Sequence, residues 1–183
     1  KIANASGVTL PGDVTVAGVL ALNSGNIVTG SYRLIMASSG SVSRTLGHVV
    51  GKFQKAVPTG SPTIVFEIGD ATNYLPVDIA FALVSTAGDL LASTTTGDHT
   101  DIVASGITPS KSVNRFWTVE DIGMVFTNYA ATLRFAASDI DATADTAGFV
   151  VAKKDGTWTL LTAGTRTSTS TQATGVTSFS DFQ

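Results

Sequence analysis

Residues 64–68 read Ile-Val-Phe-Glu-Ile, and residues 79–83 read Ile-Ala-Phe-Ala-Leu. In both stretches a large apolar side chain recurs at every second position. Successive side chains of a β-strand point to opposite faces of a sheet, so this alternation predicts strands with one face in a core. Helical periodicity is almost absent, and even the Ala-rich stretch 136–147 lacks a sustained apolar stripe. The chain is therefore predicted to be all-β, with less than about 10% helix.

The rest of residues 46–183 continues in the same way, with short apolar runs separated by Gly, Asn and Pro. Strands at this density predict an antiparallel β-sandwich domain. Asp155-Gly156 predicts a hairpin with a type I′ turn, since both residues tolerate positive φ. Further strands are expected at 48–57, 89–96, 113–119, 149–153 and 158–161. The predicted core holds Phe66, Ile79, Phe81, Leu133, Phe135 and one of the neighbours Phe116 and Trp117.

Residues 1–45 have a different pattern, with very short apolar runs and a glycine every five to seven residues. Short strands at such close spacing are typical of a β-helix-like solenoid, whose coils stack on one another. The other interpretation is a meander that adds edge strands to the sandwich. The run Ser38–Ser41 is predicted to be a linker, which places the boundary between the two parts near residue 45.

The composition excludes several classes of protein. Charged residues make up 14% of the chain and the net charge is −3 without a basic cluster, which argues against binding to nucleic acid or to an anionic membrane surface. No apolar run is long enough to cross a bilayer, so no membrane insertion is expected. The chain has no cysteine, which excludes disulfides and thiolate sites. The chain has 27 threonines and 18 serines, so hydroxyl groups and not charged groups are expected to solvate much of its surface. Such a surface suits a secreted or assembled protein.

The N-terminal segment is also the predicted partner surface. Residues 1–36 carry short apolar strands but little bulk, so they cannot offset their own ordering entropy and must dock on their own sandwich or on a neighbour. Strand edges that have no partner accept a strand from another chain. A homo-oligomer or polymer formed through residues 1–36 is therefore expected.

A series of motifs follows from residue 47 onward. In order, these are Gly47-His48-Val49-Val50-Gly51-Lys52, Phe66-Glu67-Ile68-Gly69-Asp70, Asn73-Tyr74-Leu75-Pro76-Val77, Thr96-Gly97-Asp98-His99, Ser112-Val113-Asn114-Arg115-Phe116-Trp117-Thr118 and Gly175-Val176-Thr177-Ser178-Phe179-Ser180-Asp181-Phe182. The order resembles a β-sandwich module of large bacterial secreted and cell-surface proteins, which often precedes a type IX secretion sorting domain. The Gly-punctuated segment before it also resembles what precedes the module in those proteins.

The resemblance implies an extracellular or cell-surface location and a structural or adhesive role without enzymatic activity. The preferred expectation is a self-associating subunit of a surface fibre, filament or layer. The alternative is a non-catalytic adhesin or carbohydrate-binding module of a larger surface protein. Assembly separates the two, because a subunit forms regular oligomers whereas a binding module stays monomeric and binds a glycan.

The best candidate for a metal site is the stretch containing Asp139, Asp141 and Asp145. Three carboxylates at near-alternate positions of a loop could offer oxygen ligands to calcium. The spacing is not that of an EF-hand, and the same residues also form turns without an ion.

The remaining candidate residues also have structural interpretations. His48 and His99 are the only histidines, and no serine stands in a Gly-x-Ser-x-Gly elbow to act with them, so both are expected to bond within the fold. Paired carboxylates would suit a glycosidase, but turn chemistry explains all four of the candidate residues. They are Glu67, Asp70, Glu120 and Asp121. A sugar-stacking surface could draw on Tyr74, Phe116, Trp117 and Trp158.

Overall fold

The computed structural model describes residues 1–183 and contains 55% strand and 7% helix. The prediction of an all-β chain is thereby confirmed. The helical residues form four single 3-10 turns, and the Ala-rich stretch 136–147 contains one of them whole and part of a second. The turns are η1 (Ile102–Ala104), η2 (Pro109–Lys111), η3 (Ala137–Asp139) and η4 (Thr146–Gly148).

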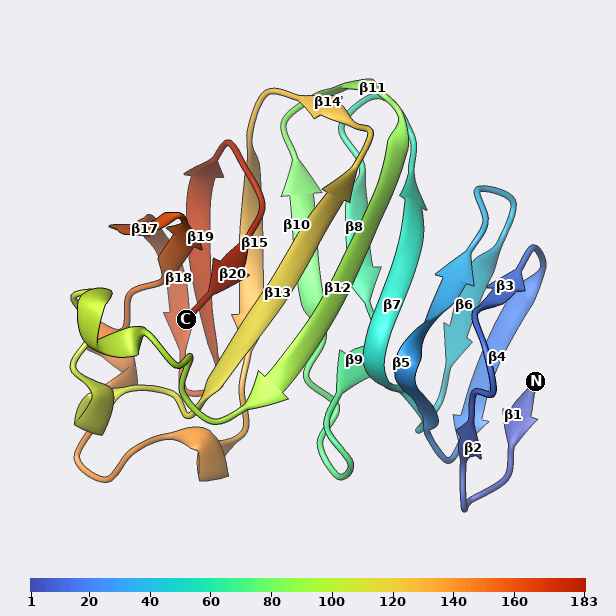
Figure 1. Cartoon of the computed structure of the whole chain (residues 1–183), viewed down its shortest axis with the longest axis horizontal. Helices are drawn as coiled ribbons and strands as arrows, with labels where there is room; N and C mark the ends of the chain where they lie inside the picture. The colour runs from blue at the N-terminus through green and yellow to red at the C-terminus, as the bar shows by residue number, and fades with distance from the viewer.

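The N-terminal segment is a β-solenoid of about three turns, as expected for these residues (Figure 1). Every strand pair within it is parallel, because successive coils run in the same direction. The first coil has β1 (Ile2–Ala3), β2 (Val8–Thr9) and β3 (Val14–Val16), the second β4 (Val19–Ser24) and β5 (Ile27–Met36), and the third β6 (Ser41–Arg44) and β7 (Val49–Val57).

The close corners between coils depend on glycine. Gly25 has a φ of +73°, and a Cβ there would lie 1.8 Å from the backbone oxygen of Asn4 in the first coil. No other residue fits this conformation and this approach. The run predicted as a linker, Ser38–Ser41, is part of such a corner: the Gly40 N–H donates to the Ala37 carbonyl at 2.8 Å, and β6 begins at once.

Two layers of sheet enclose the core, and both begin in the coils and continue into the rest of the chain (Figure 1). The long sheet has ten strands, β17-β16-β20-β13-β12-β7-β5-β2, with β3 also beside β5 and β9 beside β7. Opposite it lie the short sheet, β18-β19-β15-β10-β8, and the coil sheet, β1-β4-β6. The remaining strands are β8 (Thr63–Phe66), β9 (Ile68–Gly69), β10 (Val77–Phe81), β11 (Val84–Thr86), β12 (Gly88–Thr96), β13 (Arg115–Ile122), β14 (Val125–Phe126), β15 (Tyr129–Arg134), β16 (Ala152–Asp155), β17 (Thr157–Leu160), β18 (Thr162–Thr167), β19 (Ser170–Val176) and β20 (Asp181–Phe182).

The antiparallel sandwich predicted for residues 46–183 is present only in part. The short sheet is antiparallel throughout. The long sheet is mixed, because β7 pairs in parallel with β5 of the solenoid and antiparallel with β12. The expected boundary near residue 45 therefore lies inside one continuous sheet and one core.

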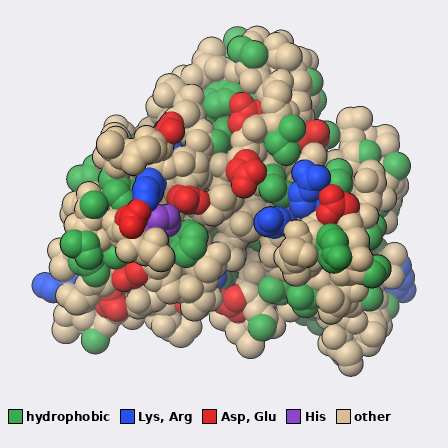
Figure 2. All heavy atoms as spheres, viewed as in Figure 1, with side chains coloured by type: hydrophobic (Ala, Val, Ile, Leu, Met, Phe, Trp, Pro, Cys, Tyr) green, Lys and Arg blue, Asp and Glu red, His purple; other side chains and the backbone are tan.

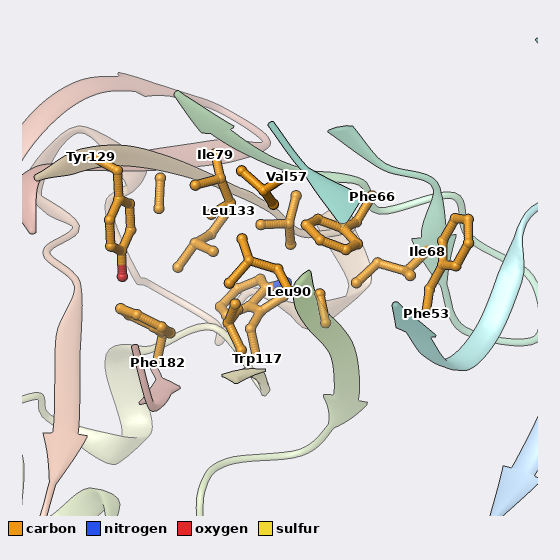
Figure 3. Packing of buried hydrophobic residues seen from close by; sticks show 14 of the residues in the cluster. Phe53, Val57, Phe66, Ile68, Ile79, Leu90, Trp117, Tyr129, Leu133 and Phe182 are labelled. Atoms are coloured by element: carbon orange, nitrogen blue, oxygen red, sulfur yellow. The ribbon is translucent and has the colours of Figure 1, made fainter. Parts of the chain in front are cut away.

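That core contains the residues expected from the sequence. Ile79 and Leu133 of the short sheet face Leu90 and Trp117 of the long sheet across the interior (Figure 3). Trp117 is the buried member of the Phe116–Trp117 pair, at 2% exposure. The other predicted core residues, Phe66, Phe81 and Phe135, are also buried.

The predicted hairpin is formed by β16 and β17, which pair antiparallel across Gly156. Its turn is not of type I′, because that turn needs positive φ at both central residues. Gly156 has a φ of +68°, whereas Asp155 keeps a negative φ. The glycine alone accommodates the reversal.

Candidate functional site: the open edge of the first coil

The first coil has backbone groups that pair with no strand among residues 1–183. The amide of Val8 in β2 donates inward to the Asn26 carbonyl at 2.8 Å, and the amide of Leu10, just after β2, donates to the Val28 carbonyl of β5 at 2.9 Å. Backbone groups alternate along a strand, so the N–H and C=O of Thr9 point outward. In β3 the carbonyl of Val16 accepts inward from Ala37 at 3.0 Å, which turns the groups of Thr15 outward as well. No strand pairs with this outer side of β2 or β3.

The apolar interior of the first coil is likewise covered on one side only. Its inward residues pack against the core but remain half-buried: Ile2, Leu10, Val14 and Val16. Their partners in the second coil, which is covered on both sides, are fully buried at 0% for Leu22, 1% for Leu34 and 3% for Met36. One more coil stacked on the edge would bury the first coil to the same degree.

Charge does not protect this edge. Residues 1–24 contain two charged side chains, Lys1 and Asp13. Asp13 is already bonded to the second coil, where it accepts the Arg33 backbone N–H at 2.9 Å and pairs with its guanidinium at 3.1 Å. The pKa of Asp13 lies below its usual value, and the largest cause is the hydrogen bond from the Arg33 backbone N–H. Across the face shown in Figure 2, charges of both signs form small groups between larger uncharged areas.

The carboxylates proposed for calcium are each bonded to the protein, and they do not come together. Asp139 is buried and binds the guanidinium of Arg115. Asp141 accepts the backbone N–H of Ser112 at 2.9 Å, and Asp145 accepts that of Ala147 at 3.0 Å. No group of three or more His, Asp or Glu residues stands close enough to hold a metal ion. An ion pair and hydrogen bonds to backbone N–H groups therefore explain the positions of all three carboxylates.

A buried ionic cluster around Arg115 is the polar centre that the sequence did not reveal. The Arg115 side chain is 0% exposed and pairs with Asp70 at 2.6 Å and with Asp139 at 2.8 Å. The hydroxyls of Thr94 and Thr96 accept further bonds, at 3.2 and 3.4 Å. A signal was available, since an arginine directly before Phe-Trp in an alternating strand lies on the same face as the buried tryptophan. Its partners, however, are 45 and 24 residues away.

Both histidines are bonded within the fold, as expected. His48 is buried, and its Nε2 donates to the Asp70 carbonyl at 2.6 Å. Burial lowers the pKa of His48, which favours the neutral ring. The Nδ1 of His99 accepts the Asp101 backbone N–H at 3.1 Å, and its Nε2 faces Asp181 at 3.4 Å. A ring committed to its own turn in this way is not poised as a general base.

The four carboxylates considered for a glycosidase are dispersed. Burial opposes the ionisation of Asp70, but the backbone N–H groups of Thr72 and Asn73 hold its pKa well below the usual value. The side chain of Asp121 accepts the Met124 amide at 3.0 Å in a turn. Two further carboxylates complete the set: Glu67 pairs with Lys55, and Glu120 is exposed at the end of β13.

The aromatic residues considered for sugar stacking do not form one surface. Trp117 is buried in the core, and the guanidinium of Arg44 lies 3.4 Å above the ring of Tyr74. Phe116 and Trp158 both stand edge-on to His99, with ring centroids 5.2 and 5.1 Å away. None of these arrangements offers a flat open platform.

No helix of the protein has the length and apolar character needed to cross a membrane. Comparison with known proteins found no matching family model, no similar curated sequence and no similar solved structure. The open edge of the first coil remains the feature of this surface that most clearly lacks a partner.

Proposed function

We propose that this chain is a structural module of the cell exterior that associates with a second copy of itself through the open edge of its first coil. The module consists of a β-solenoid that ends on a sandwich-like body. The observation that carries the proposal is the uncovered coil, with outward backbone groups at Thr9 and Thr15 beside a half-buried apolar interior. A strand added there satisfies those groups and completes the burial.

The extracellular location is supported by the surface chemistry. A quarter of the residues are Thr or Ser, while 14% are charged. Weak charge opposes association poorly, which is a liability for a free protein and an advantage for one that assembles. The resemblance to modules of bacterial surface proteins points the same way.

Two copies that meet through the same edge are related by a two-fold axis, and such a contact closes on itself as a dimer. A fibre or layer therefore needs a different contact. The far end of the long sheet offers one, because β17 has a free side there and lies at the opposite end of the molecule's long axis (Figure 1). Pairing of the first coil with β17 of the next copy, in place of a second first coil, is head-to-tail and gives an open fibre where its rotation does not close into a ring.

Proline substitutions on the open edge test the proposal. Thr9→Pro and Thr15→Pro remove an outward N–H without cutting a bond to the second coil. Sedimentation velocity should show oligomers for the wild-type protein and for the control Thr15→Val, and monomers for both proline variants. Proline variants that are folded and still assemble like the wild type would refute this edge as the contact.

A further inference from the structure

The layer opposite the long sheet is interrupted between β6 and β8. The coil sheet ends at β6 and the short sheet ends at β8, and no strand pairing joins the two. Between them lies a groove of about 310 Å³, whose walls include Val42 of β6 and Ile64 of β8. Two free strand edges therefore face each other in the middle of the molecule.

The hydrogen-bond pattern shows which groups point into this groove. The Ser41 and Thr45 amides donate to the β4 side at 3.1 and 2.9 Å, so the backbone groups of Val42 between them point away from β4. The Phe81 amide donates to the Pro62 carbonyl at 3.0 Å, which turns the groups of Thr63 and Val65 away from β10. Both edges could pair with an incoming strand.

One side chain occupies the edge of β8. Lys55 belongs to β7 of the long sheet, and its side chain reaches β8 of the short sheet. There its Nζ donates a hydrogen bond to the outward-facing carbonyl of Val65 at 2.6 Å. The same Nζ pairs with Glu67 at 2.5 Å. Both side chains are largely buried, with exposures of 12% and 13%. Burial lowers the pKa of Lys55, and the pairing with Glu67 opposes that shift.

We infer that Lys55 guards the free edge of β8 against strand addition by a second copy of the chain. An inward-pointing charge on a strand edge is a known protection, because a foreign strand would have to displace and bury it. Here the ammonium also takes the carbonyl that the foreign strand would need. The first coil has no such guard, so Lys55 directs association away from the middle of the molecule and toward its end. Its protection of the β8 edge does not depend on whether the first coil associates.

The test removes the guard without leaving an unpaired buried carboxylate. The variant is Lys55→Met with Glu67→Gln, made in the Thr15→Pro background so that the first coil cannot contribute. Lys55→Arg keeps the donors, and Lys52→Met changes an exposed lysine of the same strand. The double variant should form larger species, with the Val65 amide exchanging about tenfold more slowly as concentration rises. Neither single variant should do so.

A folded double variant that stays the size of its parent, with Val65 exchange independent of concentration, would overturn the inference. If that variant melts below the assay temperature, the apolar pair Lys55→Met with Glu67→Leu takes its place with the same two readouts. Association of Lys52→Met to the same extent as the double variant would also overturn it, because general loss of charge would then be the cause.

Discussion

At the residue scale, the most consequential side chain is Arg115, because it neutralises two carboxylates inside the protein. Replacing it with Met leaves Asp70 and Asp139 without their cation, and removing one partner of a buried pair costs about 3–5 kcal/mol. Urea denaturation should show that loss for Arg115→Met. The triple variant that also carries Asp70→Asn and Asp139→Asn should recover part of it. Equal stability of Arg115→Met and wild type would mean that the cluster is solvated in solution.

A second residue-scale prediction concerns Asp98, whose pKa is raised by burial and by the nearby charge of Asp141. A carboxyl with a raised folded-state pKa favours folding at low pH, and this contribution is lost as pH rises from the unfolded pKa of about 3.8 through the folded value. Asp98→Asn should therefore raise the melting temperature at pH 7, with the gain shrinking toward pH 3.

Asp141→Asn is the matched control with the opposite sign. Hydrogen bonds from the Ser112 backbone and the Asn114 side chain lower the pKa of Asp141. Its contribution is present above the unfolded pKa and is lost as pH falls through the folded one. This variant should lose stability at pH 7 and approach the wild type in acid. Parallel melting curves for the two variants would contradict the assignment.

At the element scale, the coil corners limit what the solenoid tolerates. Gly25→Ala forces a Cβ to within 1.8 Å of the Asn4 backbone oxygen at a φ of +73°. The expected loss is about 1–3 kcal/mol, the usual magnitude for a backbone held in a disfavoured conformation. Gly12→Ala is the control, since a Cβ at Gly12 would meet nothing within 4 Å. Chemical denaturation checks both, and similar losses in the two variants would rule out the corner as the cause.

The elements themselves were largely predictable, because each depends on local pattern. Alternating apolar residues predicted β8 and β10, and the closely spaced glycines predicted the coils. The linker prediction at Ser38–Ser41 failed because coil corners and linkers use the same small polar residues. The calcium hypothesis for Asp139 had a similar weakness: its partner Arg115 is distant in sequence, and only folding brings the two together.

At the scale of the whole molecule, pairing between distant strands decides the architecture. Local pattern does not specify that β7 joins the last coil to β12, so the sequence predicted two adjacent parts where the long sheet is continuous. The same pairing leaves the molecule with open strand edges at its N-terminal end and within its second layer. One edge is bare and the other is occupied by Lys55.

Amide exchange as a function of protein concentration tests the central claim most directly. The amides of Thr9 and Thr15 face outward and have no acceptor in a single copy, so they should exchange rapidly in dilute solution. If the first coil pairs with a second copy, both amides should become protected as concentration rises, while the Val65 amide does not change. Thr9 and Thr15 amides that exchange equally fast at every concentration, in a sample that nonetheless oligomerises, would contradict the account.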